Sequence, residues 1–410
     1  MSNVPATAMR SPTPRTSYLM GIASWYLGMG LQAVMIPTLA AVYLRVSASE
    51  LALAQVSISI PQIILLFFSG RIADRNDGRK MLILIHGLGT LPGVMIFWLV
   101  WTNNLNYWQL IVFGLSMGCL FAFSAPTRDS LLTRVTTSNI QKGVMASMIV
   151  QFVAQLIGFS LAGFAAPFAG PWTLPAMHAV AVGLGLYTAW ALPSYPALSD
   201  EHGPAPTNSW LQGLKTVLDS ETLFPVLLLN LAVGICFVGV FMVSLPLIVR
   251  DVFNGGQLEI SIISFCFWGG SIVTALSLLF LKPIQNRGKF MCLGTILGAV
   301  ALLLTSLAPT FLLMCVACSV WGICAGFNMT MSRTIVQVAA PPRMRAQILA
   351  LLMLCFMGAA PFGAFAMGYL SPIIGAQIAP AISSVLMIVF GITLVLTTKA
   401  WSIVKDPNEI

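Results

Sequence analysis

Long apolar runs without charged residues constrain this chain more than any other feature of its sequence. Of its 410 residues, 58% are hydrophobic and only 8% are charged, whereas a soluble domain carries about 25% charged residues. Apolar runs of about 20 residues are typical of transmembrane helices, and the strands of a membrane barrel are shorter and alternate. We therefore predict an all-α integral membrane protein with twelve transmembrane helices. The predicted spans are 18–44, 51–70, 81–101, 107–126, 143–166, 172–193, 223–249, 259–281, 290–307, 310–332, 346–370 and 376–398.

The basic residues predict how these helices are oriented. If the N-terminus is cytoplasmic, 18 of the 20 Lys and Arg residues fall in cytoplasmic segments, and only Arg45 and Arg250 fall on the other side. An excess of positive charge is typical of cytoplasmic loops. We predict a multi-pass protein of the cell inner membrane, surrounded by the lipid bilayer, with both termini in the cytoplasm. This topology accounts for the net charge of +8, so we predict no nucleic-acid partner.

Basic landmarks recur in the two halves of the chain. Arg45 and Arg250, after the first and seventh spans, are 205 residues apart, and Lys142 and Arg345, before the fifth and eleventh, are 203 apart. Two equivalent bundles with a binding site between them are typical of secondary transporters. We therefore predict two pseudo-symmetric six-helix bundles. The predicted segments are a cytoplasmic tail 1–17, an N-terminal bundle 18–193, a cytoplasmic linker 194–222, a C-terminal bundle 223–398 and a cytoplasmic tail 399–410.

The segment between the second and third spans carries the sharpest motif. Residues 70–80 read Gly-Arg-Ile-Ala-Asp-Arg-Asn-Asp-Gly-Arg-Lys and resemble the signature loop of the major facilitator superfamily. Their register is similar to the branch of enterobactin exporters and macrolide efflux proteins, in which a basic residue usually stands at the position of Gly78. Segments 157–163 and 358–363 are similar to further motifs of these exporters, although Phe159 replaces a proline. The resemblance implies the major facilitator fold.

Two acids inside this basic segment predict a latch. Asp74 and Asp77 are not needed to set the topology. Gly70 lets the helix ends approach closely, and charges at helix ends interact with the helix dipoles. We predict a cytoplasmic charge network that favours the outward-open state, with Asp129 paired to Arg75 or Arg79. The alternative is a solvated loop that acts only in topology. The predicted latch residues are Gly70, Asp74, Arg75, Asp77, Arg79 and Asp129.

Polar but uncharged residues inside the spans are the candidates for binding a substrate. Neutral donors in an apolar cavity suit an amphipathic organic molecule better than a small ion. The alternative is that these side chains form hydrogen bonds between helices, each contributing about 0.6 kcal/mol. The pair Gln151 and Gln155, one turn apart, is the strongest candidate. The predicted cavity residues are Gln32, Gln62, Gln151, Gln155, Asn230 and Asn328.

No acidic residue lies deep within a predicted span, where transporters driven by protons often keep a titrating carboxylate. If protons drive transport, the coupling candidates are therefore acids near the span ends, namely Asp129, Glu50 and Asp251. The histidines within spans, His86 and His178, are interpreted as structural. The resemblance, and not these residues, implies export and proton coupling.

We predict a secondary active transporter that exports a small amphipathic molecule, siderophore-like or drug-like, in exchange for protons by alternating access. The alternative is uptake or facilitated diffusion of a nutrient. An integral-membrane enzyme would need acidic or histidine clusters, and the spans have none, so we predict no enzyme activity and no metal site. A phosphate-binding loop of the GxxxxGK type is also absent, and we predict no cofactor. We expect the protein to act as a monomer.

Overall fold

The described part of the first half of the chain consists of helices joined by short connections. The computed structural model describes residues 13–135, 140–195, 209–280, 284–341 and 344–403, and no strand occurs among them. The helices of the first half are α1 (Pro14–Pro37), continued by the π-helix η1 (Thr38–Tyr43), then α2 (Ala48–Arg75), α3 (Gly78–Trp101), α4 (Tyr107–Val135), α5 (Ile140–Ala169) and α6 (Thr173–Trp190).

The second half repeats this series after a short helix, α7 (Ser209–Leu218), which lies within the predicted linker and packs against α8 and α13. The first long helix of this half is composite. It consists of α8 (Leu223–Val233), the π-helices η2 (Gly234–Val238) and η3 (Val240–Ser244), and α9 (Leu245–Asp251). The others are α10 (Gln257–Phe280), α11 (Arg287–Ser306), α12 (Phe311–Ala339), α13 (Arg345–Ile374) and α14 (Ile378–Thr397), followed by the 3-10 helix η4 (Lys399–Ser402).

Eleven helices of the described chain are long and apolar enough to cross a membrane. The remaining predicted span, the sixth (172–193), corresponds to α6, which is 18 residues long and packs against α1 and α3. His178 and Pro175 lower the mean hydropathy of this helix. Its place in the bundle is nevertheless that of a sixth long helix, so the all-α membrane fold is confirmed.

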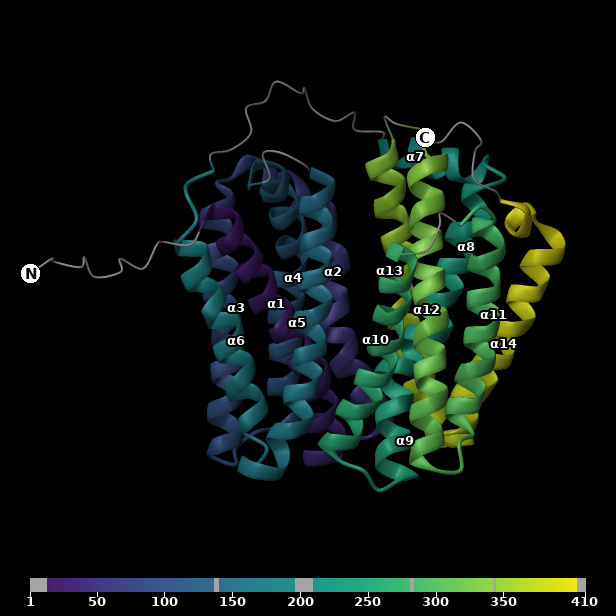
Figure 1. Cartoon of the computed structure of the whole chain (residues 1–410). Coiled ribbons are helices and arrows are strands. Elements are labelled where there is room, and N and C mark those ends of the chain that lie inside the picture. The colour runs from purple at the N-terminus through teal and green to yellow at the C-terminus, as the bar shows by residue number, and fades with distance from the viewer. Residues whose placement is uncertain (1–12, 136–139, 196–208, 281–283, 342–343, 404–410) are drawn as a thin grey trace, which may run out of the picture.

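The helices group into two bundles that pack in the same way. In the first, α2 lies against α4 and α3 against α6, and in the second, α10 lies against α12 and α11 against α14. The bundles touch each other mainly where α2 meets α13 and α5 meets α10. Figure 1 shows them side by side, with their ribbons close together at the lower end of the view and apart at the upper end.

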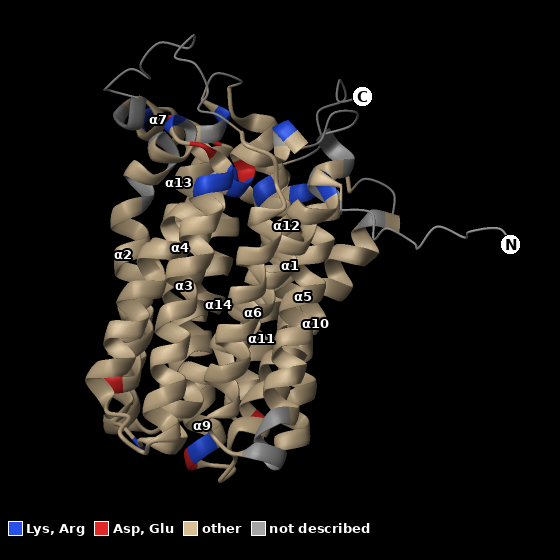
Figure 2. Cartoon of the chain, turned by 90° about the vertical axis from the view of Figure 1, so that its left-hand side faces the viewer, with Lys and Arg blue, Asp and Glu red and all other residues tan. Residues whose placement is uncertain are grey.

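Charged residues mark the two ends of the molecule. They gather at the end where α1 begins and η4 lies, and few are found at the other end, near α9 (Figure 2). We call the first end the terminal face and the second the Arg250 face. Between them the helices are almost free of charge, as expected for a segment inside a bilayer.

The predicted loop between the second and third spans is mostly helical. The predicted apolar span ends at residue 70, whereas the helix α2 continues to Arg75, and only Asn76 and Asp77 separate it from α3. Helices α4 and α12 also extend beyond their predicted ends, to Val135 and Ala339. Apolar runs mark only the part of a helix that lies in lipid, and a polar turn can continue the same helix outside it.

Two glycines of the exporter-like motifs allow helices to pack closely. A Cβ atom on Gly158 of α5 would lie 2.6 Å from the carbonyl oxygen of Leu27 in α1. A Cβ atom on Gly363 of α13 would lie 2.0 Å from the carbonyl oxygen of Ile235 in η2. Small residues at such crossings are typical of membrane helices, because packing rather than hydrophobic burial drives their association.

Candidate functional site

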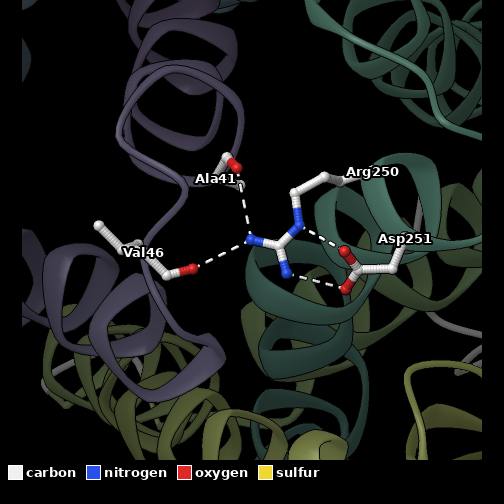
Figure 3. A network of polar contacts seen from close by, with 4 residues as sticks. All are labelled: Ala41, Val46, Arg250 and Asp251. Carbon is white, nitrogen blue, oxygen red and sulfur yellow. Dashed lines mark hydrogen bonds and ion pairs between the residues drawn. The ribbon is translucent and has the colours of Figure 1, made fainter.

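The Arg250 face carries a polar connection between the two bundles. Arg250 lies at the end of α9, and its Nη1 donates hydrogen bonds to the carbonyl oxygens of Ala41 and Val46 in the other bundle, at 3.3 and 3.0 Å. Asp251 accepts from Nε at 2.5 Å and from Nη2 at 2.8 Å (Figure 3). This bidentate ion pair holds the guanidinium in the orientation in which it contacts the carbonyl groups of the first bundle. The predicted coupling residue Asp251 therefore positions Arg250 in this structure.

Two glutamine amides add cross-bundle hydrogen bonds on the same side. Nε2 of Gln55 in α2 donates to the carbonyl oxygen of Met242 in η3, at 3.2 Å. Nε2 of Gln257, the first residue of α10, donates to the carbonyl oxygen of Ala162 in α5, at 2.6 Å. Both glutamines are buried, so these bonds tie the bundles together away from solvent.

Close packing adds to these cross-bundle hydrogen bonds, and we call all of these contacts together the Arg250 seal. The hydroxyl of Ser261 donates to the carbonyl oxygen of Phe159, and the Phe159 ring stacks on Trp268 of α10 with centroids 6.4 Å apart. Gly368 of α13 faces α2 so closely that a Cβ atom on it would lie 2.6 Å from the Cβ of Ala52. The hydrogen bonds and packing contacts named here all belong to the half of the molecule near the Arg250 face.

At the terminal face, Asp77 ties the start of α3 to the segment that follows α6. It is the N-cap of α3 and accepts from the backbone N–H groups of Arg79 and Lys80, at 2.8 and 3.3 Å. It also accepts from the Ser194 hydroxyl and from the N–H of Tyr195. Partial burial acts to raise the pKa of Asp77, but these hydrogen bonds outweigh it and lower the pKa below its ordinary value of 3.8.

Replacing Asp77 by alanine is expected to reduce the stability of the purified protein by about 1 kcal/mol at neutral pH, because the N-cap is lost. Since the folded-state pKa lies below the unfolded value, this stabilisation is present above about pH 4 and is lost as the pH falls through the folded pKa. The difference in Tm between wild type and Asp77→Ala should therefore disappear under acid conditions. Asp219→Ala, at an exposed position on the same face, is the control. A difference that is the same at every pH would contradict this role.

The other predicted latch residues are described only in part. Gly70 and Asp74 lie on the last turns of α2, but the side chain of Asp74 is outside the described residues. Arg75 is exposed, and Nη2 of Arg79 donates to the carbonyl oxygen of Trp190 at 2.9 Å. Contacts of Asp77 and Arg79 thus stay inside the first bundle in this conformation, and the latch stays a prediction.

Asp129, near the end of α4, lies beside the second bundle. The positive charge of Arg333 in α12 acts on its carboxylate more strongly than that of Arg128, its neighbour in sequence. Both Asp129 and Arg333 are exposed. Opposite charges on α4 and α12 therefore attract each other at the terminal face without a direct ion pair among the described residues, and the sequence did not suggest Arg333 as a partner for Asp129.

The glutamines proposed for the substrate cavity differ in their surroundings. Gln62 of α2 and Gln151 of α5 are partly exposed, whereas Gln32 of α1 and Gln155 of α5 are buried. The Oε1 atom of Gln32 has no hydrogen-bond partner among the described residues. Gln62 and Gln151 are thus the glutamines of this group that are not buried.

The two asparagines form hydrogen bonds between helices. Nδ2 of Asn230 in α8 donates to the Ser332 hydroxyl of α12 at 2.9 Å, and also to the carbonyl oxygen of Val226. Nδ2 of Asn328 in α12 donates to the Thr295 hydroxyl of α11 at 2.7 Å. Both are buried. These contacts match the structural alternative considered for the polar residues within spans.

Glu50 and the histidines have local partners. Glu50 forms a capping box at the start of α2, where its carboxylate accepts from the N–H and hydroxyl of Ser47, at 2.8 and 2.7 Å. His86 and His178 are fully buried, and Nδ1 of His86 donates to the carbonyl oxygen of Val182 at 2.9 Å. No group of residues able to hold a metal ion occurs in the described part of the chain.

A family model identifies the architecture to which these contacts belong. The model of the Major Facilitator Superfamily matches residues 18–364, most of the chain. The chain belongs to the major facilitator superfamily. Two curated members are 24% identical to it. They are an uncharacterized MFS-type transporter of Bacillus subtilis, YfiS, aligned over 67% of this chain and 66% of its own length, and macrolide efflux protein A of Streptococcus pyogenes, aligned over 69% and 71%.

Solved members of the superfamily have the same fold at much lower identity. The nucleoside transporter NupG superposes with a TM-score of 0.73 at 14% identity, covering 93% of this chain and 98% of NupG. A bacterial homologue of the human lysosomal transporter Spinster, described as inward-facing and unoccupied, gives 0.68 at 14% identity and covers 96% and 99%. Family and fold support a membrane transporter of the secondary type and point away from an enzyme.

Sequence reasoning missed the main contact of the Arg250 face. Arg45 and Arg250 had equal weight as repeat landmarks, but only Arg250 bridges the bundles, while Arg45 is exposed. The one available signal was Asp251, directly beside Arg250. A carboxylate next to an isolated arginine predicts a fixed guanidinium, but it does not predict which carbonyl groups the guanidinium contacts.

Proposed function

We propose that this protein is a secondary active transporter that exports a small amphipathic organic molecule by alternating access. The observation that carries the proposal is the uneven contact between the bundles. Cross-bundle hydrogen bonds and the Phe159–Trp268 stack lie near the Arg250 face, and the ribbons stand apart at the terminal face (Figure 1). A transporter that opens alternately to each side needs a contact of this kind that can form and break.

The direction of transport follows from the orientation we infer. Lys and Arg residues gather at the terminal face (Figure 2), which favours a cytoplasmic location for that face in the inner membrane. The Arg250 seal then faces the outside, and the conformation is inward-facing. Similarity to macrolide efflux protein A supports export of a drug-like molecule. Gln62 and Gln151, partly exposed and uncharged, are the proposed polar contacts for such a substrate.

Proton exchange is the energy source that we propose. The coupling carboxylates would be Asp129, which lies near Arg333, and Asp251, which holds Arg250, because each belongs to a contact between the bundles. Protonation of either acid would weaken one of these contacts. Glu50 is a weaker candidate, since it already caps α2.

The latch would act in the opposite conformation. When the terminal face closes, the ends of α2 and α4 approach the second bundle, and Asp74, Arg75 and Asp129 would form ion pairs across it. Each contact of about 1.4 kcal/mol made in only one conformer shifts the equilibrium tenfold. The latch residues would thus favour the outward-open state, while Arg250 favours the inward-facing one.

A flux experiment tests the proposal. A thermal-shift screen of the purified protein against macrolides, siderophores and nutrients selects the compound that stabilises it most, and this compound is then loaded into liposomes that contain the protein. An imposed pH gradient is expected to accelerate its movement against the direction of proton flow at least tenfold. Collapse of the gradient with a protonophore is the control. Equal flux with and without the gradient would reject proton exchange, and flux in the direction of proton flow would support uptake.

A further inference from the structure

Arg128 of α4 is a buried cation held between aromatic rings. Its side chain is 5% exposed, and its Cζ lies 4.8 Å from the ring centroid of Trp25 and 5.8 Å from that of Tyr26, both on α1. The aromatic faces stabilise the positive charge through cation–π interactions. We call these three residues the Arg128 cradle.

At least one nitrogen of the Arg128 guanidinium has no hydrogen-bond partner among the described residues. This nitrogen is Nη2, which is buried. No described carboxylate forms a direct ion pair with Arg128, and the charge of the exposed neighbour Asp129 acts on it without such a contact. A guanidinium removed from water without a paired anion is strongly unfavourable. A purely structural arginine would be expected to direct its planar fork at a carboxylate or at backbone carbonyl groups.

A second unpaired donor lies beside it. Ser124 is one turn before Arg128 on α4 and therefore on the same face of the helix. It is 2% exposed, and its Oγ also has no partner among the described residues. His86 packs edge-on against Trp25 with centroids 5.4 Å apart. Its Nδ1 donates to a backbone carbonyl, so Nε2 offers only an acceptor, and we do not count it as an anion ligand.

The cradle lies between α1 and α4 of the first bundle, close to the terminal face, and Tyr26 is its only member that is not buried. Arg333 of α12, in the second bundle, is near enough for its charge to act on both Tyr26 and Asp129. Arg128 is also two turns from the end of α4 at Val135. A ligand bound between the bundles on this side would therefore meet Tyr26 first, with the buried guanidinium of Arg128 behind its ring.

We infer that Arg128 and Ser124 bind an anionic group, a carboxylate, sulfonate or phosphate, of the transported molecule, and that Trp25 and Tyr26 contact its apolar part. The inference rests on the proposed function, which it deepens by assigning amphipathic organic anions as the substrate class. Arg333 reaches the same anion when the terminal face closes, so the substrate itself favours closure. The rival interpretation is an arginine that only holds α1 against α4 and is hydrated by buried water.

Equilibrium binding of two matched probes distinguishes these interpretations. Dansylglycine carries a carboxylate, and dansylglycinamide has the same fluorophore and nearly the same size without the charge. Binding to the purified full-length protein in nanodiscs is followed by dansyl fluorescence. The wild type is expected to bind the carboxylate at least tenfold more tightly than the amide, because a charged pair is stronger than a neutral one. Equal affinity for the two probes would overturn the inference.

Variants then assign the preference to the cradle. Arg128→Gln is expected to remove the tenfold preference, while Arg15→Gln, which removes an exposed positive charge at the same face, should keep it. Retention of the preference in Arg128→Gln would reject the site. Ser124→Ala is a small change that the helix tolerates, so it tests the site even if Arg128→Gln does not fold. We expect it to weaken dansylglycine binding about threefold and to leave dansylglycinamide binding unaffected. A response to Ser124→Ala that is equal for both probes, or absent, would also reject it.

A matched control exists in the second bundle. Ser244 of η3 is fully buried, and its Oγ likewise lacks a partner among the described residues. Ser244→Ala should leave the preference for the carboxylate unchanged, and an equal loss in both serine variants would favour a general effect on packing.

The assay measures binding and not flux. A protein that prefers the anion but does not move it would contradict the proposed function, whereas a transporter of neutral compounds without this preference would contradict only the cradle.

Discussion

Arg250→Gln is expected to lower transport at least tenfold while the protein still reaches the membrane. The substitution removes the charged donor to the carbonyl oxygens of Ala41 and Val46 and leaves Asp251 without its partner. Hydrogen bonds from charged donors contribute about 1.5–3 kcal/mol when buried, and partial exposure of Arg250 reduces this figure. A loss of about 1.4 kcal/mol already shifts the equilibrium between conformers tenfold.

The measurement separates opening of the seal from misfolding. Ser59, one turn from Gln55 on α2, is buried in this structure. In a background in which the eight native cysteines are replaced, Ser59→Cys is expected to react faster with an impermeant thiol reagent when the Arg250 face opens. Arg45→Gln is the control, because it removes an exposed arginine from the same face. If both variants transport as the wild type does, and Ser59→Cys reacts no faster in the Arg250→Gln background, the seal does not depend on Arg250.

Gly368→Ala is expected to have an effect of similar size by a steric route. Its added methyl group would lie 2.6 Å from the Cβ of Ala52 and 2.9 Å from the carbonyl oxygen of Ala48, well inside normal contact distances. Helix backbones do not yield as side-chain ends do, so α13 and α2 must separate at the Arg250 face. Overpacking of this kind costs about 1–3 kcal/mol, and we expect transport to fall roughly five- to a hundredfold.

Gly269→Ala is the matched control for this substitution. A Cβ atom on Gly269 of α10 would meet nothing closer than the Phe265 ring, at 3.9 Å, so its transport should stay close to that of the wild type. Labelling at Ser59→Cys should increase in Gly368→Ala and not in Gly269→Ala. Normal transport by Gly368→Ala would mean that the α2–α13 contact is not part of the transport cycle.

Sequence reasoning predicted the helices well because the information is local. Apolar runs have to match the thickness of a bilayer, so their number and order follow from composition along the chain. Helix ends were predicted less well. Residues 71–75 include three charged side chains yet are helical, since an α-helix satisfies its own backbone hydrogen bonds in water as well as in lipid. The π-helical segments η1 and η2–η3 have no recognisable signal in the sequence, because the register of backbone hydrogen bonds depends on packing against neighbouring helices.

The candidate residues show the same division. Their types and depths could be read from the chain, but their partners could not. Asn230 and Asn328 resemble Gln62 and Gln151 in sequence, and only the structure pairs the first two with hydroxyl groups of neighbouring helices. Hydrogen bonds between helices depend on rotation about each helix axis, and a helix without charges carries little information about that rotation.

The sequence by itself determined that this chain is a membrane protein of two repeated helical bundles, because the length of each apolar run and the position of each basic landmark can be read within a single segment of the chain. Tertiary structure alone decided which end of the molecule is sealed. Arg250, Gln257 and Gly368 acquire that role from carbonyl groups and methyl groups that lie more than 90 residues away in the chain. Contacts of this kind exist only once both bundles have folded and met, so no local pattern can encode them.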